Sequence, residues 1–113
     1  MIYRIADEQD WWLARQTGQF VSADLAAEGF MHASELQQVL RTAEKYCRGK
    51  TGLVLLEIDD AILGEKVVRE DLTDRGLRFP HIYAPIPLHA IVRHFAFPEN
   101  AGGGFSLPPA LAE

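Results

Sequence analysis

The chain has 113 residues, 48% hydrophobic and 24% charged, a composition typical of one folded domain with a modest core. Its net charge of −5 disfavours nucleic acid as a partner, although eight arginines leave room for a local basic pocket. The single cysteine, Cys47, excludes an internal disulfide and fits a cytoplasmic environment. No apolar run approaches the roughly 20 residues that span a bilayer, and the N-terminus lacks a signal-peptide pattern, so no membrane partner is expected.

The first third of the chain alternates strand and helix patterns. Asp7 is placed to cap a first helix, and Gly18 and Gly29 are residues at which helices commonly end. Trp11 and Trp12 are adjacent, so only one of them can face the core from that helix. The expected elements are strands over residues 2–5 and 30–33 and helices between residues 7 and 18 and over 24–28.

The clearest helix runs from Leu36 to Cys47, where apolar residues recur with helical spacing. Ser34, followed three residues later by Gln37, has the capping-box pattern for its start. Beyond it, patterns indicate a buried central strand over 53–58, an edge strand over 66–70, a loop over 72–78, an irregular edge segment over 79–86 and a last strand over 90–97.

This order of elements predicts an α+β fold with a largely antiparallel sheet. We expect two to three helices packed on that sheet in a single domain over residues 1–97. Residues 98–113 contain three consecutive glycines and two consecutive prolines at 108–109, which indicates a flexible C-terminal tail, pinned at most by Phe105 or Leu107.

Two short segments hold the residues best suited to chemistry. His32 and Ser34 lie two residues apart, as do His81 and Tyr83, so each pair shares one face of an extended strand. Together with Arg4, they would suit a substrate that has a carbonyl, a ribose or a phosphate. Each residue also has a structural interpretation: either histidine can be a hydrogen-bonded core residue, Ser34 a helix cap, Arg4 a solvated strand residue and Tyr83 an amphipathic edge residue.

Several common site classes are absent from the sequence. There is no glycine-rich dinucleotide or phosphate-binding motif, and the three glycines at 102–104 precede no helix. There is no His-x-x-x-His or Cys-x-x-Cys pair, and the spacing of His32, His81 and His89 is generic, so no metal is expected.

Four segments closely resemble the bacterial domain-of-unknown-function 952 family. Gly-Phe-x-His-x-Ser and Phe-Pro-His-Ile-Tyr are specific as a pair, and the motifs occur in the family's order over about residues 1–93. The matching segments are residues 2–5, 29–34, 54–59 and 79–86.

That family in turn resembles the ADP-ribosyltransferase fold, in particular the catalytic half of the tRNA 2′-phosphotransferases. The resemblance implies an ADP-ribosyltransferase-like split sheet with a nucleotide site. The chain departs from the 2′-phosphotransferase pattern at two positions, with Arg4 in place of a histidine and Glu28 in place of an arginine. The glutamate of diphtheria-toxin-type transferases has no clear sequence counterpart near His81.

The resemblance also implies roles for the candidate residues. NAD would be the substrate, with Arg4 on phosphate or ribose, His32 on a ribose hydroxyl and Ser34 on the nicotinamide ribose or amide. His81 or Tyr83 would position the nucleophile or stabilise charge at the reacting carbon. Two hypotheses follow: a transferase-like enzyme acting on NAD, an ADP-ribosylated product or a phosphorylated nucleotide, and a non-catalytic module that binds a small ligand or a partner.

Overall fold

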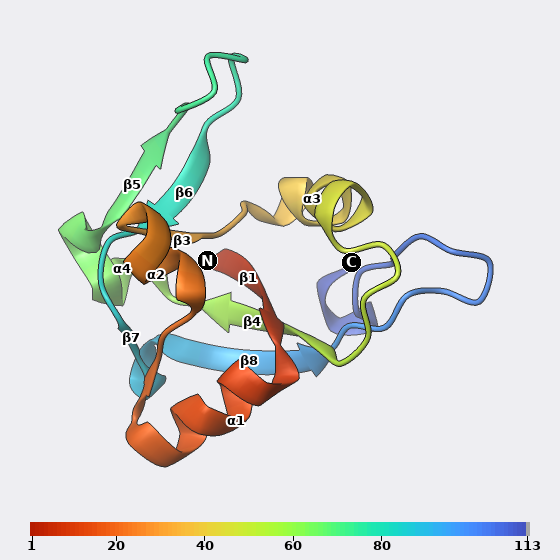
Figure 1. The fold of residues 1–113 in the computed structure, drawn as a ribbon, viewed down its shortest axis with the longest axis horizontal. Helices are drawn as coiled ribbons and strands as arrows, with labels where there is room; N and C mark the ends of the chain where they lie inside the picture. Colours follow the sequence, from red (N-terminus) through yellow and green to blue (C-terminus); the bar gives the residue numbers. More distant parts are fainter. Residues whose placement is uncertain (113) are drawn as a thin grey trace.

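Strand β4 (Leu53–Ile58) is the centre of the main sheet in the computed structural model, which describes residues 1–112 (Figure 1). All six of its residues are buried, which explains its nearly continuous apolar sequence. It pairs antiparallel with β1 (Ile2–Asp7) on one side and β8 (Ile91–Ala96) on the other. The predicted central strand and the antiparallel α+β class are therefore confirmed.

A second antiparallel sheet, with strand order β3-β6-β5, carries both histidine motifs. It is joined to the main sheet by a bridge in which the backbones of Tyr3 and Ser34 exchange two hydrogen bonds of 2.8 Å. Figure 1 shows the β5–β6 hairpin extending away from the main sheet. The remaining strands are β3 (Met31–His32), β5 (Val67–Glu70) and β6 (Phe79–Ile82), and the two-stranded ribbon of β2 (Gln19–Phe20) with β7 (Ile86–Pro87).

The helices are short and lie mostly in the first half of the chain. Gly18 and Gly29 end α1 and α2 in the left-handed conformation, with φ of 93° and 88°, as the sequence predicts. Trp11 is buried and Trp12 is 53% exposed, so only one of the pair contributes to the core. The α-helices are α1 (Glu8–Thr17), α2 (Ala23–Glu28), α3 (Val39–Tyr46) and α4 (Asp60–Leu63), and the 3₁₀ turns are Leu36–Gln38, Gly64–Lys66, Leu88–Ala90 and Pro109–Leu111.

The predicted cap of the main helix is wrong by one residue. The capping box is formed by Glu35 and Gln38, and the helix opens with a 3₁₀ turn before α3 begins. Ser34 cannot serve as the cap because its backbone N–H and carbonyl are both bonded to Tyr3, so the carbonyl is not available for the first hydrogen bond of the helix. Its hydroxyl instead lies 3.3 Å from the Thr42 hydroxyl.

A buried carboxylate, Glu57, ties the three strands of the main sheet together. Its side chain accepts hydrogen bonds from the Tyr3 hydroxyl at 2.7 Å and from the Arg93 guanidinium at 2.6 and 3.1 Å. Burial, followed by the hydrogen bond to Glu57, raises the pKa of Tyr3 to about 12. The carboxylate is thus satisfied within the sheet and is a structural element of the fold.

The segment after β8 returns to the body of the protein. Phe105 is buried and stacks on Phe97 with ring centroids 5.2 Å apart, and Leu111 is buried in the same cluster. The Glu99 carboxylate also accepts a hydrogen bond from the backbone of Gly49 at 2.9 Å. The sequence predicted a flexible tail over 98–113, and the contacts of Phe105 and Leu111 anchor its described part.

Replacing Phe105 by alanine tests this anchoring. Deleting a buried phenylalanine costs about 3 kcal/mol, so the free energy of unfolding in urea should fall by about that amount. Tyr46→Ala, which removes an aromatic side chain that is 63% exposed, serves as the control with a change of about 0.5 kcal/mol or less. Equal, small changes in both variants would show that the tail is not packed.

Candidate functional site

His32 and His81 are direct partners across neighbouring strands. The β3–β6 register pairs His32 with His81 and Met31 with Ile82. Because directly opposed residues in an antiparallel pair point to the same face, both imidazoles project from one side of the sheet. Their ring centroids lie 5.7 Å apart with the planes at 77°. The predicted meeting of the two histidine motifs is therefore found.

Phe30 joins the two histidines into an aromatic cluster. Its buried ring stacks on His81 at 4.2 Å and meets His32 edge-on at 5.1 Å. Tyr83, which is 40% exposed, lies 5.4 Å from the same ring. These four residues, hereafter the histidine cluster, bring aromatic surface and three hydrogen-bonding groups to one place.

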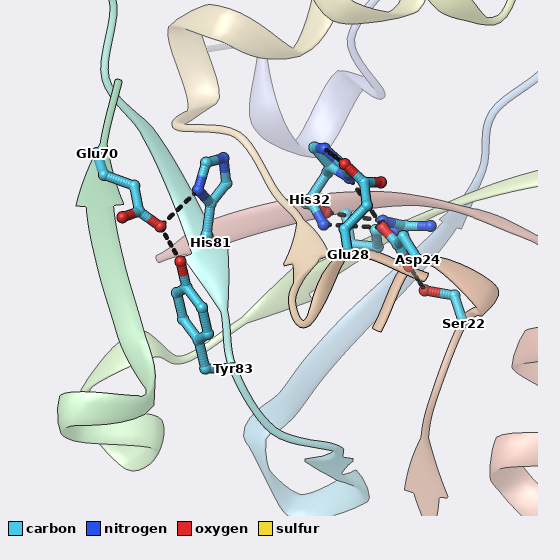
Figure 2. Close-up of polar contacts among 8 residues, drawn as sticks. Ser22, Asp24, Glu28, His32, Glu70, His81 and Tyr83 are labelled. Carbon is cyan, nitrogen blue, oxygen red and sulfur yellow. Dashed lines mark hydrogen bonds and ion pairs between the residues drawn. The ribbon is translucent and has the colours of Figure 1, made fainter. Parts of the chain in front are cut away.

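Asp24 fixes the His32 side of the histidine cluster. Its Oδ2 atom accepts hydrogen bonds from Arg4 at 2.6 Å, from the His32 backbone at 3.0 Å and from the His32 Nδ1 atom at 3.0 Å. Ser22 donates to the other carboxylate oxygen. Helix α2 ends in the left-handed turn at Gly29, which sends the chain back so that Asp24 lies against β3 (Figure 2).

These contacts determine the charges of Asp24 and His32. The hydrogen bond to Asp24 is the main cause that raises the pKa of His32; burial opposes it and the charge of Glu28 adds to it. Burial raises the pKa of Asp24, but hydrogen bonds from His32 and Ser22 outweigh it and hold that pKa below its usual range. The Glu28 carboxylate lies 3.6 Å from the His32 Nε2 atom. The pair therefore favours an imidazolium beside a carboxylate.

Glu70 plays the corresponding part for His81. Its Oε2 atom accepts hydrogen bonds from His81 Nδ1 at 2.8 Å and from the Tyr83 hydroxyl (Figure 2). The bond from Tyr83, and then that from His81, lowers the pKa of Glu70, and Glu70 raises the pKa of Tyr83. With Nδ1 bonded to a carboxylate, neutral His81 carries its proton there and presents a lone pair on Nε2.

Two other predicted residues face inward. Arg4 donates to Asp24 and, at 2.9 Å, to the His32 carbonyl, so its guanidinium is engaged within the protein. The Ser34 hydroxyl is buried next to Thr42. Arg4 thus supports the site through Asp24, while a ligand contact by Arg4 or Ser34 remains a prediction.

Asp24 and Glu70 are the site residues that sequence reasoning missed. No glutamate was expected beside His81, yet the β5–β6 hairpin brings Glu70 next to it from eleven residues upstream. The available signal was the alternation of side chains along β5. Val68 pairs with His81, and Glu70 lies two residues after Val68, so Glu70 and His81 share one face of the sheet.

Two hollows lie away from the histidine cluster. A cavity of about 490 Å³ runs between β8 and the C-terminal segment, lined by His94, Phe95 and three prolines among others. A second, of about 230 Å³, is lined by residues 49–52 and 97–99. No group of three or more potential metal ligands comes together within residues 1–112. No helix in that range is long and apolar enough to cross a membrane.

The fold and the cluster define a small α+β protein with two carboxylate-bonded histidines on one sheet face. The chain matches the family described as protein of unknown function DUF952 over residues 5–94, and it belongs to that family. No curated protein matches it.

Protein CC0527 from Caulobacter crescentus is similar over nearly the whole chain. Its crystal structure is 36% identical, covers 99% of this chain and 98% of its own, and has a TM-score of 0.88. Its solution NMR structure is 37% identical, covers 98% and 96% of the two chains, and has a TM-score of 0.83.

The Asp24–His32 pair predicts a pH dependence of stability. Because the pKa of His32 is raised on folding, its contribution is complete below the ordinary value of 6.5 and is lost as pH rises through the folded pKa. The free energy of unfolding should therefore fall more steeply above about pH 6.5 in the wild type than in Asp24→Asn. Glu28→Gln, the control, should change the slope less, and an identical slope in Asp24→Asn would contradict the assignment.

Proposed function

We propose that the histidine cluster is the active site of an enzyme that acts on the ribose of a nucleotide such as NAD or ADP-ribose. The observation that carries this proposal is the meeting of two imidazoles over Phe30, with Asp24 bonded to one and Glu70 to the other. A neutral imidazole has one donor and one acceptor nitrogen, and the side-chain hydrogen bonds of both rings within the described residues are made by Nδ1. Two opposed histidines, each oriented by its own carboxylate, form the kind of pair used in proton transfer.

The order of motifs supports an ADP-ribosyltransferase-like site. In the transferases that the chain resembles, two parts of the chain belong to one nucleotide pocket. They are the residue at the position of Arg4 and the strand that corresponds to the one holding His32. Arg4 and His32 share the Asp24 carboxylate, although they are 28 residues apart in the chain. The likeness of fold is a weaker support than this contact, since one fold hosts many activities.

The position of each residue in the histidine cluster suggests a different role. His32, whose side chain is 52% exposed, would donate a hydrogen bond to a ribose hydroxyl. His81 and Tyr83 would orient the attacking group through the Nε2 atom and the hydroxyl. The exposed side of the Tyr83 ring offers a planar surface for stacking a base.

One observation favours the alternative, a non-catalytic module that binds a small ligand. Three carboxylates, those of Asp24, Glu28 and Glu70, lie beside the two histidines, and Arg4 is already paired with one of them. This charge balance is unfavourable for a pyrophosphate and suits an uncharged or cationic group. On this alternative the histidines would recognise a ligand without transforming it.

Calorimetric titration with NAD and with ADP-ribose tests the proposed site. We expect saturable binding of at least one ligand, weakened about tenfold or more in His32→Ala because a hydrogen bond to ribose is lost. His89→Ala is the matched control, since His89 is exposed on the Leu88–Ala90 turn. Absence of binding by the folded wild type, or equal loss in both variants, would contradict the proposal.

A further inference from the structure

We infer that His81 accepts and His32 donates a proton during hydrolysis, and that the substrate is a ribose linked through oxygen to a protein side chain. This inference rests on the proposed nucleotide site and adds to it a direction of reaction and a class of leaving group. It is carried by the different surroundings of the two rings and by the exposure of the His32 side chain.

The acceptor role of His81 follows from its contacts. Glu70 accepts the hydrogen bond from Nδ1, which leaves the lone pair on Nε2. Within residues 1–112, Nε2 has no hydrogen-bond partner in the chain. Figure 2 shows this nitrogen on the side of the ring that faces away from Glu70. Tyr83 also bonds to Glu70, so the carboxylate is held from two sides.

The donor role of His32 follows from a different set of groups. Asp24 on α2 binds its Nδ1 atom, and Glu28 on the same helix lies 3.6 Å from Nε2, beyond hydrogen-bond distance. The cationic neighbour on β1, Arg4, is neutralised by Asp24. The carboxylates favour the imidazolium. Its Nε2–H group faces Glu28 without a hydrogen bond, and the side chain is 52% exposed, so a substrate can reach that group.

A catalytic proton donor is needed for some leaving groups and not for others. Nicotinamide leaves NAD as a neutral ring, because the bond pair returns to a positively charged nitrogen, and it needs no proton. A hydroxyl-linked ribose would leave as an alkoxide, which requires a proton donor. A donor–acceptor pair therefore fits hydrolysis of an oxygen-linked ribose better than cleavage of NAD.

The step balances with water as the only co-reactant. The water oxygen bonds to the anomeric carbon and gives a proton to His81 Nε2. The bond between that carbon and the leaving oxygen breaks, and the leaving oxygen keeps the electron pair and takes a proton from His32 Nε2. The products are a free ribose and an alcohol. Proton exchange with solvent then restores both rings. The ring centroids lie 5.7 Å apart on one face of the sheet, so a single substrate can contact both rings.

The exposure of the site indicates a large leaving group. The side chain of His32 is 52% exposed and that of Glu28 is 50% exposed, while the two cavities described above are lined by other residues. Small molecules are usually enclosed in a concave pocket. The proton donor, His32, is exposed, whereas the proton acceptor, His81, is buried. This arrangement fits a substrate whose leaving group remains part of a polypeptide.

The direct test uses a peptide with ADP-ribose on a serine hydroxyl, alongside NAD at the same concentration. We expect release of ADP-ribose from the peptide with a bell-shaped pH profile and much slower loss of NAD. His32→Ala and His81→Ala should each lower the rate about 100-fold or more, while His89→Ala leaves it unchanged. Faster turnover of NAD than of the peptide would overturn the inference. Binding of ADP-ribose without cleavage of the peptide would overturn the hydrolysis inference but not the proposed nucleotide site. Absence of ADP-ribose binding would contradict both the inference and the nucleotide site.

A spectroscopic readout tests the proton positions without a substrate. Nitrogen-15 spectra of the wild type should show His81 with its proton on Nδ1, and Glu70→Gln should populate the other tautomer. Glu44→Gln, which alters an exposed pair between Glu44 on α3 and Arg48 beyond its end, is the control and should leave His81 unchanged. A wild-type His81 protonated on Nε2 would overturn the inference.

Discussion

The Asp24 carboxylate is the interaction on which the site depends. It gathers donors from three elements: Arg4 from β1, Ser22 before α2, and both the backbone and the ring of His32 in β3. Charge-assisted hydrogen bonds of this kind are stronger than neutral ones, and a largely buried carboxylate would be costly without them. The same group therefore holds α2 against the sheets and orients one of the two histidines.

The second histidine is fixed by a different principle, the register of an antiparallel sheet. His81 lies opposite His32 because β3 and β6 pair at that residue, and a slip of one residue would turn one ring to the other face. The bridge between Tyr3 and Ser34 then ties this sheet to the main one. Two independent constraints, a shared carboxylate and a strand register, thus meet in one cluster.

Sequence patterns predicted the elements better than the contacts between them. The central strand was readable from its apolar run and the ends of α1 and α2 from Gly18 and Gly29, because these signals are local. Asp24 and Glu70 were not identified because their roles depend on a turn and a hairpin that bring distant residues together. The helix cap was misplaced for a related reason, since a bridge to another strand holds Ser34.

The charge of the site limits the chemistry that it can support. With three carboxylates beside two histidines, protons can be held and moved. The similarity to the Caulobacter protein extends over nearly the whole of both chains, so the two proteins share this fold. The most direct measurement follows the ring nitrogens of His32 and His81 by NMR while ADP-ribose is added. A single site predicts that both rings respond together with one saturation curve, and unchanged signals of both rings would contradict it.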